Sequence, residues 1–324
     1  MIVVTGASGL LGGNLVRELL KEGHRVRCVV HHDCRSLDGL DVEIVHGDVR
    51  KEESMCKAFK STQIVYHLAG EISLKMDNWS HMEAINVVGV RNVVNACLAC
   101  NVDRLIHFSS IHAKKQKPFH VPLDESRDLV GKDGAVPYDW SKAAGEIEVR
   151  KGIAKGLDAV IINPTGILGP YDYKPSFFGK GIIWIAKGFL PILVNGGFNW
   201  VDARDVAVGA IKAAQTATPG SNYLLGGHWR SLVDIGNMVS DILGKNPPYF
   251  SVPLWLAYLG IPIMHGFSLA TKQRNIFTRV TLHSLNSNRK IRHDLASREL
   301  GYQPRTLNET ITDVLSWFSM NGYL

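Results

Sequence analysis

Short apolar segments alternate with segments of helical periodicity through the first half of the chain. The first apolar segment, residues 2–5, is followed by apolar positions at helical spacing over residues 11–20, and Gly23 ends this predicted helix. Further helices are expected at about residues 81–100 and from Tyr138 onward. Because the predicted strands are apolar on both faces, they indicate a doubly wound α/β fold, a parallel sheet covered by helices on both sides. These strands are residues 2–5, 26–30, 42–46, 64–68, 104–109 and 159–163.

The alternation stops after Pro164. Gly-Pro, Lys-Pro and Gly-Gly pairs interrupt the chain there, and aromatic residues gather between residues 171 and 200. Helices at residues 206–214 and 307–318 and a short strand at residues 223–225 are expected beyond this point. We therefore predict a first domain of residues 1–165 and a smaller lobe of residues 166–324, in which about residues 200–226 return to the sheet.

The composition is that of a globular protein that can bury a large core. The chain has 324 residues, of which 45% are hydrophobic and 20% charged, and this sets disordered and fibrous classes aside. No secretory leader precedes the first apolar segment, and no apolar run approaches the roughly 18 residues of a membrane-spanning helix. Five cysteines, all in the first third, do not form a disulfide framework. A cytoplasmic location is therefore expected.

Positive charge is concentrated late in the chain. The net charge is +6, and no Asp or Glu occurs between Asp241 and Asp294. The simplest interpretation is a solvated face, and the alternative is attraction to an anionic nucleotide-type substrate or a membrane surface. Nucleic acid is not expected as a partner, because no aromatic-basic interleaving accompanies the charge. The cations in this stretch are Lys245, Lys272, Arg274, Arg279, Arg289, Lys290 and Arg292.

The same stretch contains an apolar segment at residues 254–264, broken by Gly260 and Pro262. It is too short to span a bilayer. We expect it to cover the substrate pocket or the core, with a weak membrane-surface contact as the alternative.

A glycine-rich turn joins the first strand to the first helix. Gly6 permits a sharp exit from the strand, Gly9 leaves room for a phosphate to approach the backbone, and Gly12 lets the helix pack close to the sheet. Free N–H groups at the start of the helix, around Ser8 and Leu10, favour an anion. This strand–turn–helix context predicts that the first domain binds a dinucleotide and leaves residues 166–324 for the substrate.

The end of the second strand bears on cofactor preference. A carboxylate at this position would bind the ribose 2′-hydroxyl of NAD and repel the 2′-phosphate of NADP. His31 occupies it instead, and Arg35 follows as a phosphate partner, which favours NADP(H). Asp33, between them, keeps NAD(H) open.

Two further strand ends are expected to contact the cofactor. Asp48 and Val49 follow the third strand and are placed for the adenine edge, although Asp48 is also suited to cap the next helix. Leu68, Ala69 and Gly70 end the fourth strand, where small residues let a ligand lie against the backbone.

Tyr138 and Lys142 are the candidate proton-transfer pair. Residues four apart share one face of a helix, so both side chains point into the same space. A free tyrosine has a pKa near 10, and a neighbouring ammonium is expected to lower it toward the working range. A third group should hydrogen-bond the reacting oxygen. Ser109 and Ser110 end the fifth strand at the ligand edge of the sheet, and Ser110 is preferred.

These motifs together resemble the extended short-chain dehydrogenase/reductases, the superfamily of the NAD-dependent epimerases/dehydratases, which have a Rossmann fold. The resemblance runs nearly end to end and implies that Ser110, Tyr138 and Lys142 form a catalytic triad. It further implies that Asn86 supports the active site and that Pro164 lies against the nicotinamide carboxamide. A homodimer through the two long helices is implied as well. The matching residues are Gly6, Gly9, Gly12, 47–49, 86–89, Ser109, Ser110, 138–142, Glu146, 164–166, 169–170, 201–207 and 300–305.

Within this superfamily, residues 164–170 are most similar to dihydroflavonol-reductase-like members. The arginine usual in this strand and loop of sugar-nucleotide epimerases is missing, and Ser110 is followed by Ile111 and His112 rather than the Thr-Asp-Glu pattern of 4,6-dehydratases. The resemblance therefore implies an oxidoreductase that transfers hydride between NADP(H) or NAD(H) and a small-molecule carbonyl or secondary alcohol. Alternatives are a nucleotide-sugar epimerase with retained NAD and a non-catalytic nicotinamide-sensing regulator.

No metal site is predicted. Cys97 and Cys100 have redox-type spacing, but they lie on a predicted helix without a second ligand pair, which favours core packing. The histidines His31, His32 and His112 are expected to form local hydrogen bonds.

Overall fold

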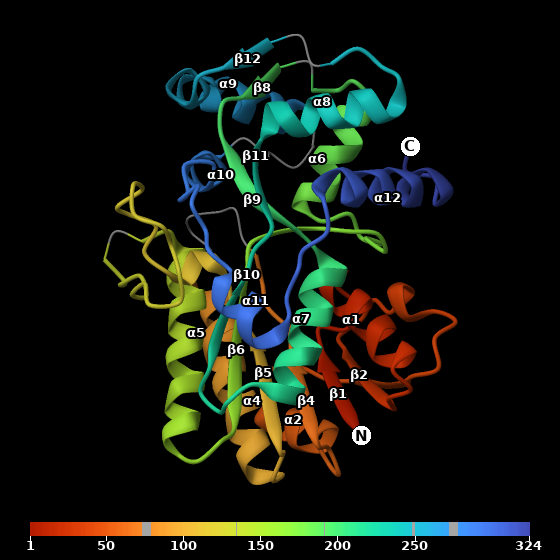
Figure 1. The fold of residues 1–324 in the computed structure, drawn as a ribbon, viewed down its shortest axis with the longest axis vertical. Coiled ribbons are helices and arrows are strands. Elements are labelled where there is room, and N and C mark those ends of the chain that lie inside the picture. The colour runs from red at the N-terminus through yellow and green to blue at the C-terminus, as the bar shows by residue number, and fades with distance from the viewer. Residues whose placement is uncertain (73–78, 134, 191, 248–249, 272–277) are drawn as a thin grey trace.

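Seven parallel strands form the centre of the computed structural model, which describes residues 1–324 apart from 73–78, 134, 191, 248–249 and 272–277. The strand order is β10-β6-β5-β4-β1-β2-β3 (Figure 1). All six pairings are parallel. Each strand predicted in the first half is present, and the predicted strand at residues 223–225 pairs beside β6 as β10. The strands are β1 (Ile2–Thr5), β2 (Val26–Val30), β3 (Glu43–His46), β4 (Ile64–His67), β5 (Arg104–Phe108), β6 (Ala159–Pro164) and β10 (Asn222–Leu225).

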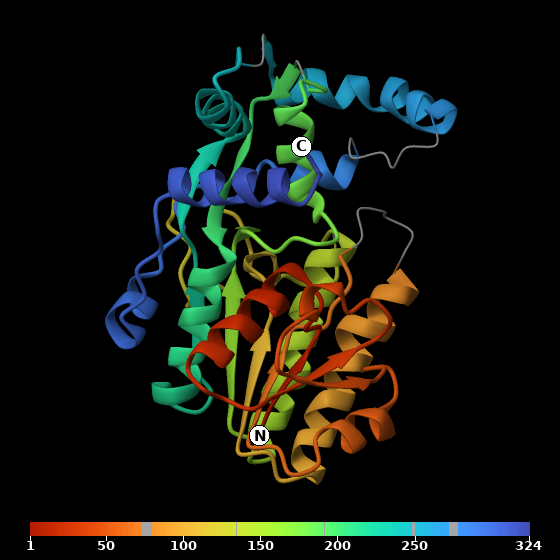
Figure 2. The ribbon, with the colours of Figure 1, turned by 90° about the vertical axis from the view of Figure 1, so that its right-hand side faces the viewer.

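Helices cover both faces of this sheet, which confirms the predicted doubly wound fold (Figure 2). Alternate strand residues enter opposite cores, so that Tyr66 packs with one helix layer and its neighbour Val65 with the other. One layer contains α1 (Leu10–Lys21), α7 (Ala203–Thr216) and α11 (Asp294–Leu300). The other contains α2 (Glu52–Ala58), α4 (Gly89–Ala99) and α5 (Pro137–Ala154).

The helix predicted at residues 81–100 is not continuous. Between α3 (Trp79–Glu83) and α4 lies a π-helical segment, Ala84–Val88. Opposite it on α5 stands Gly145, where a Cβ would lie 2.6 Å from the carbonyl oxygen of Asn86. The wide turn thus packs directly against α5, and such turns are common at functional sites. Apolar periodicity alone does not distinguish it from an α-helix.

The second lobe is built on two small sheets that the sequence did not predict. One has the order β11-β9-β7 and the other pairs β12 with β8. Its core is aromatic, and Phe178, Phe198 and Trp200 make mutual edge-to-face contacts. The strands are β7 (Gly166–Leu168), β8 (Ile192–Val194), β9 (Gly197–Asp202), β11 (His228–Ser231) and β12 (Phe250–Val252). The helices are α6 (Phe177–Ala186), α8 (Leu232–Leu243), α9 (Leu254–Thr271), α10 (Arg279–Ser284) and α12 (Leu307–Met320).

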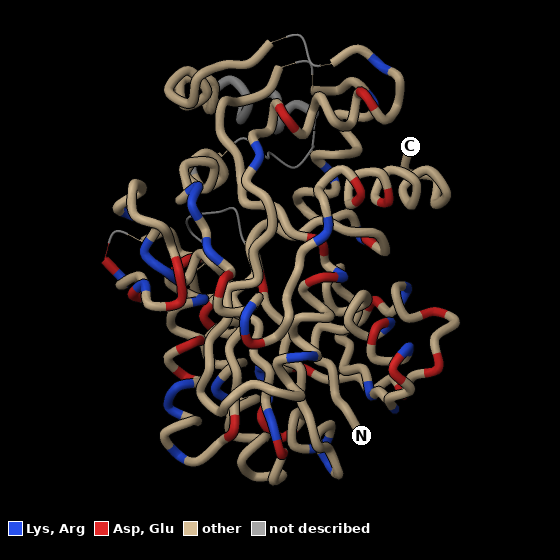
Figure 3. Tube along the Cα trace, viewed as in Figure 1, with Lys and Arg blue, Asp and Glu red and all other residues tan. Residues whose placement is uncertain are grey.

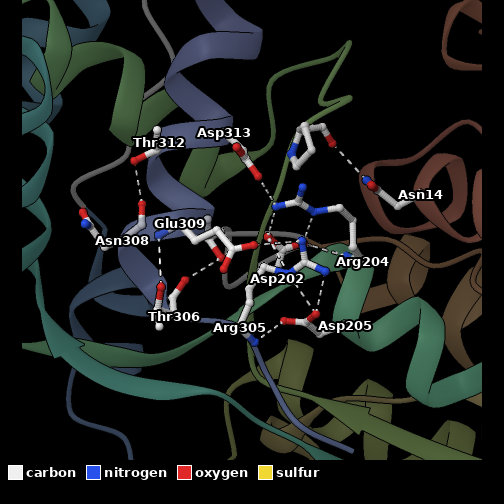
Figure 4. A network of polar contacts seen from close by, with 12 residues as sticks. Asn14, Asp202, Arg204, Asp205, Arg305, Thr306, Asn308, Glu309, Thr312 and Asp313 are labelled. Atoms are coloured by element: carbon white, nitrogen blue, oxygen red, sulfur yellow. Dashed lines mark hydrogen bonds and ion pairs between the residues drawn. The ribbon is translucent and has the colours of Figure 1, made fainter.

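A network of ion pairs ties the lobe to the sheet domain (Figure 4). Asp202, at the end of β9, accepts from the backbone N–H of Arg204 and so caps α7. The Arg204 guanidinium lies 2.7 Å from both Asp202 and Asp313, the latter on α12. Arg305 pairs with Asp205 at 2.9 Å. The segment before α12 is thereby fixed against the junction between β9 and α7.

Candidate active site

A cavity of about 370 Å³ lies at the carboxyl edge of the sheet, below the second lobe. It brings together ten of the predicted site residues, namely Gly6, Gly9, Leu10, Gly12, Leu68, Gly70, Ser110, Tyr138, Lys142 and Pro164. The others are not on its wall: Ser8, His31, Arg35, Asp48, Val49, Ala69 and Asn86.

The glycine turn forms one wall and has the shape of a phosphate cradle. A Cβ on Gly12 would collide with the carbonyl oxygen of Gly6, and one on Gly6, where φ is +69°, would lie 2.6 Å from the Ala69 nitrogen. Gly9 is exposed, and its nearest neighbour would be 3.4 Å away. No side chain caps the N-terminus of α1 at Gly9, so its N–H groups face the space that Gly9 leaves open. These residues fit a dinucleotide pyrophosphate.

At the end of β2, the predicted ribose contacts are exposed. His31 packs against the ring of His32, with centroids 3.9 Å apart. Arg35 donates to Asp33 at 2.7 Å, and this pairing lowers the pKa of the Asp33 carboxyl to about 2. The arginine is therefore present at the expected edge, but its charge is matched by a neighbouring carboxylate.

Asp48 is held by an arginine that the sequence interpretation did not consider. Arg50 donates to its carboxylate at 2.7 Å, and this bond lowers the pKa of Asp48 to about 2. The expected cap is wrong, because α2 begins after Lys51 and the Asp48 carboxylate accepts from Arg50 instead. The carbonyl of the adjacent Val49 accepts from Asn92 on α4 at 2.9 Å.

Ser110 and Tyr138 both line the cavity, and the Ser110 hydroxyl is near enough to the phenol to act on its pKa. Pro137 starts α5 and places Tyr138 in its first turn, facing the end of β5. The Ser110 hydroxyl also accepts from the His112 backbone N–H at 3.2 Å, which fixes the serine side chain. Burial raises the pKa of Tyr138 to about 12, although the hydrogen bond with Ser110 acts in the opposite direction.

Lys142 stands one helical turn after Tyr138, as predicted. Its ammonium donates to the carbonyl oxygen of Phe108 at 3.0 Å. Burial lowers the pKa of Lys142 to about 8, while the charge of Glu146 raises it. The expected lowering of the Tyr138 pKa by this ammonium is wrong for this structure, because burial of the phenol dominates and the lysine is held by the β5 carbonyl.

Asn86 does not contact the cavity but holds residues that do. Its side-chain amide donates to the Glu71 carbonyl and to Ser141 Oγ, both at 2.9 Å, and its oxygen accepts from the Glu71 N–H at 2.8 Å. Ser141 in turn donates to the Tyr138 carbonyl at 2.8 Å. The π-helical turn thus links the segment after β4 to the first turn of α5, and Asn86 is a positioning residue.

Behind Ser110, Tyr138 and Lys142 lies a buried polar layer that sequence reasoning missed. His67 on β4 and His107 on β5 are paired in register, and burial lowers the pKa of His67 to about 3 and that of His107 well below its usual value. On β6, the Asn163 amide donates to Glu146 and to the Ser110 carbonyl. Polar residues near the ends of otherwise apolar strands were the available signal.

The far end of the cavity is apolar. The wall formed by the second lobe includes Phe177, Phe178, Phe198, Val280 and Ile291, with the uncharged polar residues Ser176, Asn199, Thr281 and Ser284 beside them. Among the described residues that line the cavity there is no arginine, and Lys142 is the one lysine. Such a surface suits an uncharged apolar molecule. His112 also lies on the wall, with Nδ1 3.6 Å from the Asp139 carboxylate.

None of the cysteines forms a disulfide bond. All five are free thiols, and Cys97 is buried in the core between α4 and the sheet, which confirms the packing prediction for that residue. Within the described part of the chain, no three His, Cys, Asp or Glu side chains are grouped to hold a metal ion.

Comparison with known proteins agrees with this geometry. The model of the NAD dependent epimerase/dehydratase family matches residues 2–226. Sterol demethylase protein B of Methylococcus capsulatus is 31% identical over 333 residues, with 99% of each chain covered. A Synechocystis sp. protein named after dihydroflavonol 4-reductase is 31% identical over 330 residues, covering 99% of this chain and 95% of its own.

A solved structure, that of gox2253, has a TM-score of 0.87 at 32% identity and covers 100% of this chain and 99% of its own. The predicted resemblance, including its dihydroflavonol-reductase-like branch, is confirmed. The chain belongs to the NAD dependent epimerase/dehydratase family, a group of NAD(P)-dependent enzymes within the extended short-chain dehydrogenases/reductases.

Proposed function

We propose that the protein is an NADP(H)-dependent oxidoreductase that interconverts a carbonyl and a secondary alcohol on an apolar small molecule. One observation carries this proposal. Ser110, Tyr138 and Lys142 line one cavity together with the glycine cradle and a largely apolar wall.

The glycine turn would hold the cofactor phosphates, and Leu68, Gly70 and Pro164 would line its path toward Tyr138. The nicotinamide ring of the bound cofactor supplies or accepts the hydride. NADP(H) is preferred because His31, and not an acid, ends β2, with Arg35 beyond it. Asp33, paired with Arg35, is the feature that supports the alternative, NAD(H).

Ser110 and Tyr138 would both hydrogen-bond the reacting oxygen of the substrate. In reduction the Tyr138 hydroxyl donates its proton to that oxygen, and in oxidation the phenolate accepts it. Lys142 would supply a positive charge near the phenolate only after exchanging its present contact with the Phe108 carbonyl.

The epimerase alternative is less well supported, because a nucleoside diphosphate substrate requires cations and the described wall has one lysine and no arginine. A nicotinamide-sensing regulator needs no triad, whereas Ser110, Tyr138 and Lys142 are all present here. We further propose a homodimer through α4 and α5. The cytoplasmic location stays a prediction.

The test is NADPH and NADH oxidation by the purified protein across a panel of apolar ketones and aldehydes. We expect NADPH-dependent reduction of at least one bulky apolar carbonyl, and a loss of roughly 10²–10⁴-fold in kcat for Tyr138→Phe. Undiminished turnover by Tyr138→Phe would contradict the mechanism. Cofactor binding without turnover across the panel would favour the regulator, and NAD released only on denaturation would favour the epimerase.

A further inference from the structure

Helix α9 is apolar on every side, yet one of its sides is exposed. Its sequence from Leu254 to Thr271 contains no charged residue. Leu254, Ala257 and Ile261, spaced by three and four residues, face the aromatic core of the lobe. Trp255 and Leu259, on the other side, are each 66% exposed. A helix that is apolar all round is ordinarily buried all round.

The exposed side continues onto the neighbouring strands. Phe250 on β12 and Ile192 on β8 are partners in the register of the small sheet, and both are exposed. Phe189 is exposed just before β8. We name Phe189, Ile192, Phe250, Trp255, Leu256 and Leu259 the tip patch. Figure 2 shows α9 projecting beyond the rest of the molecule, so the patch has no cover from the described part of this chain.

Between Asp241 and Asp294, the part of the sequence that contains most of the tip patch, every charged residue is positive. The sequences of α9, β8 and β12 contain no charged residue. Acidic positions do occur on the neighbouring helix α8, at Asp234 and Asp241 (Figure 3). The exposed Lys187 and Lys245 flank the patch, and Lys245 donates to the Ala186 carbonyl at 2.7 Å. Lys272 and Arg274 lie outside the described residues. Apolar and aromatic side chains bordered by lysines match the interface of an anionic bilayer.

The same helix leads to the substrate cavity. α9 packs against α10, and Val280 and Ser284 of α10 line the cavity at its apolar end. No helix of the described residues is long and apolar enough to cross a membrane. Helix α10 thus lies between the exposed side of α9 and the cavity.

We infer that the tip patch docks on the surface of an anionic lipid membrane and that the substrate class is membrane-dissolved. The substrate part rests on the proposed function, whereas the docking does not. A second copy of the chain is the competing occupant. The run of residues 242–293 without an acid, together with the connection of α9 to the cavity through α10, favours lipid.

The test is co-sedimentation of the full chain with phosphatidylcholine vesicles, with and without phosphatidylglycerol, at low and high salt. We expect binding to the anionic vesicles that weakens as salt is raised. The double variant Trp255→Asp/Leu259→Asp should bind at least about ten-fold less. The matched control is Val208→Asp/Met320→Asp, which alters two exposed apolar residues elsewhere and should bind like the wild type. Cofactor affinity checks that each variant is folded.

Three results would overturn the inference. These are no binding of the wild type to anionic vesicles, equal losses in both double variants, or a dimer in sedimentation velocity that only the Trp255→Asp/Leu259→Asp variant dissociates. If docking holds, the tip variant should reduce a vesicle-borne ketone more slowly while reducing a water-soluble one at the wild-type rate. Vesicle binding requires no turnover. The docking can therefore fail while the oxidoreductase function stands, and the oxidoreductase function can fail while the docking stands.

Discussion

His67 lies directly opposite His107 across β4 and β5, with ring centroids 5.4 Å apart. Thr5 shares a hydrogen bond of 2.7 Å with His67 Nδ1. Both rings are buried, and burial lowers the pKa of each, that of His67 to about 3. The pair is therefore neutral in the folded protein at neutral pH.

This pair should make the fold sensitive to acid. In the unfolded chain a histidine takes up its proton below about pH 6.5, whereas the folded protein excludes it until much lower pH. The stability conferred by neutral histidines is thus present above pH 6.5 and is lost as the pH falls toward 3. We expect each histidine to lower the free energy of unfolding by roughly 1 kcal/mol per pH unit below about pH 6.

Urea unfolding between pH 7.5 and 5 measures this dependence. His107→Leu should flatten it, because the variant has one histidine fewer to titrate. His32→Leu, which alters an exposed histidine, is the control and should leave the slope unchanged. Equal slopes in the wild type and His107→Leu would contradict the prediction.

Ser110→Ala should lower kcat by about 10²-fold, because the variant loses a donor to the reacting oxygen. It should also move the basic limb of the kcat–pH profile upward, because the hydrogen bond from Ser110 lowers the pKa of Tyr138. Ser109 is buried beside it on the cavity wall and provides the control. If Ser109→Ala were the damaging change and Ser110→Ala harmless, the two roles would be reversed.

Lys142→Met should inactivate the enzyme and stabilise it. The pKa of Lys142 is lowered to about 8 by burial, so at pH 7 the folded protein bears the cost of a buried ammonium. Above pH 8 the folded state releases this proton while the unfolded state retains it up to about 10.5, so wild-type stability from this group rises over that interval. We expect Lys142→Met to raise the free energy of unfolding at pH 7 by about 1–2 kcal/mol.

Urea unfolding at pH 7, measured with NADPH affinity, tests the Lys142 prediction. Lys115→Met removes an exposed lysine paired with Asp128 and should change neither quantity appreciably. A destabilised Lys142→Met protein would show that the ammonium contributes to folding.

Arg35→Ser should raise the KM for NADPH at least about ten-fold and leave that for NADH nearly unchanged, because the variant loses the cation nearest the expected 2′-phosphate. Asp33→Ala should have the opposite effect on NADPH, since it frees Arg35 from its carboxylate partner. Arg25→Ser, at the opposite end of β2, is the control. A wild type that prefers NADH would refute the cofactor assignment.

The sequence predicts the sheet because its strands are short, mostly apolar runs and most of the connections between them show helical periodicity. It also indicates Tyr138, Lys142 and Ser110, since these depend on spacing along one helix and on one strand end. The π-helical turn at Asn86 was not predicted, because it depends on the approach of Gly145 from another helix. His67 and His107 were missed for a similar reason: they lie on separate strands, and only sheet pairing places them together.

The second lobe was the least predictable part. Its strands are three to six residues long, and their partners lie far away in the chain, as in the antiparallel pairing of β9 with β11. The apolar segment at residues 254–264 was recognised, but the exposure of Trp255 and Leu259 depends on how α9 packs.

The ion-pair network of Figure 4 also sets an order of assembly. Asp205 and its partner Arg305 are 100 residues apart in the chain. A ribosome-bound chain that has emerged only as far as β10 already contains the complete seven-stranded sheet, but Asp202 and Asp205 still lack the guanidinium of Arg305. The second lobe is consequently fixed to the sheet late in synthesis, after all seven strands of the central sheet have become available.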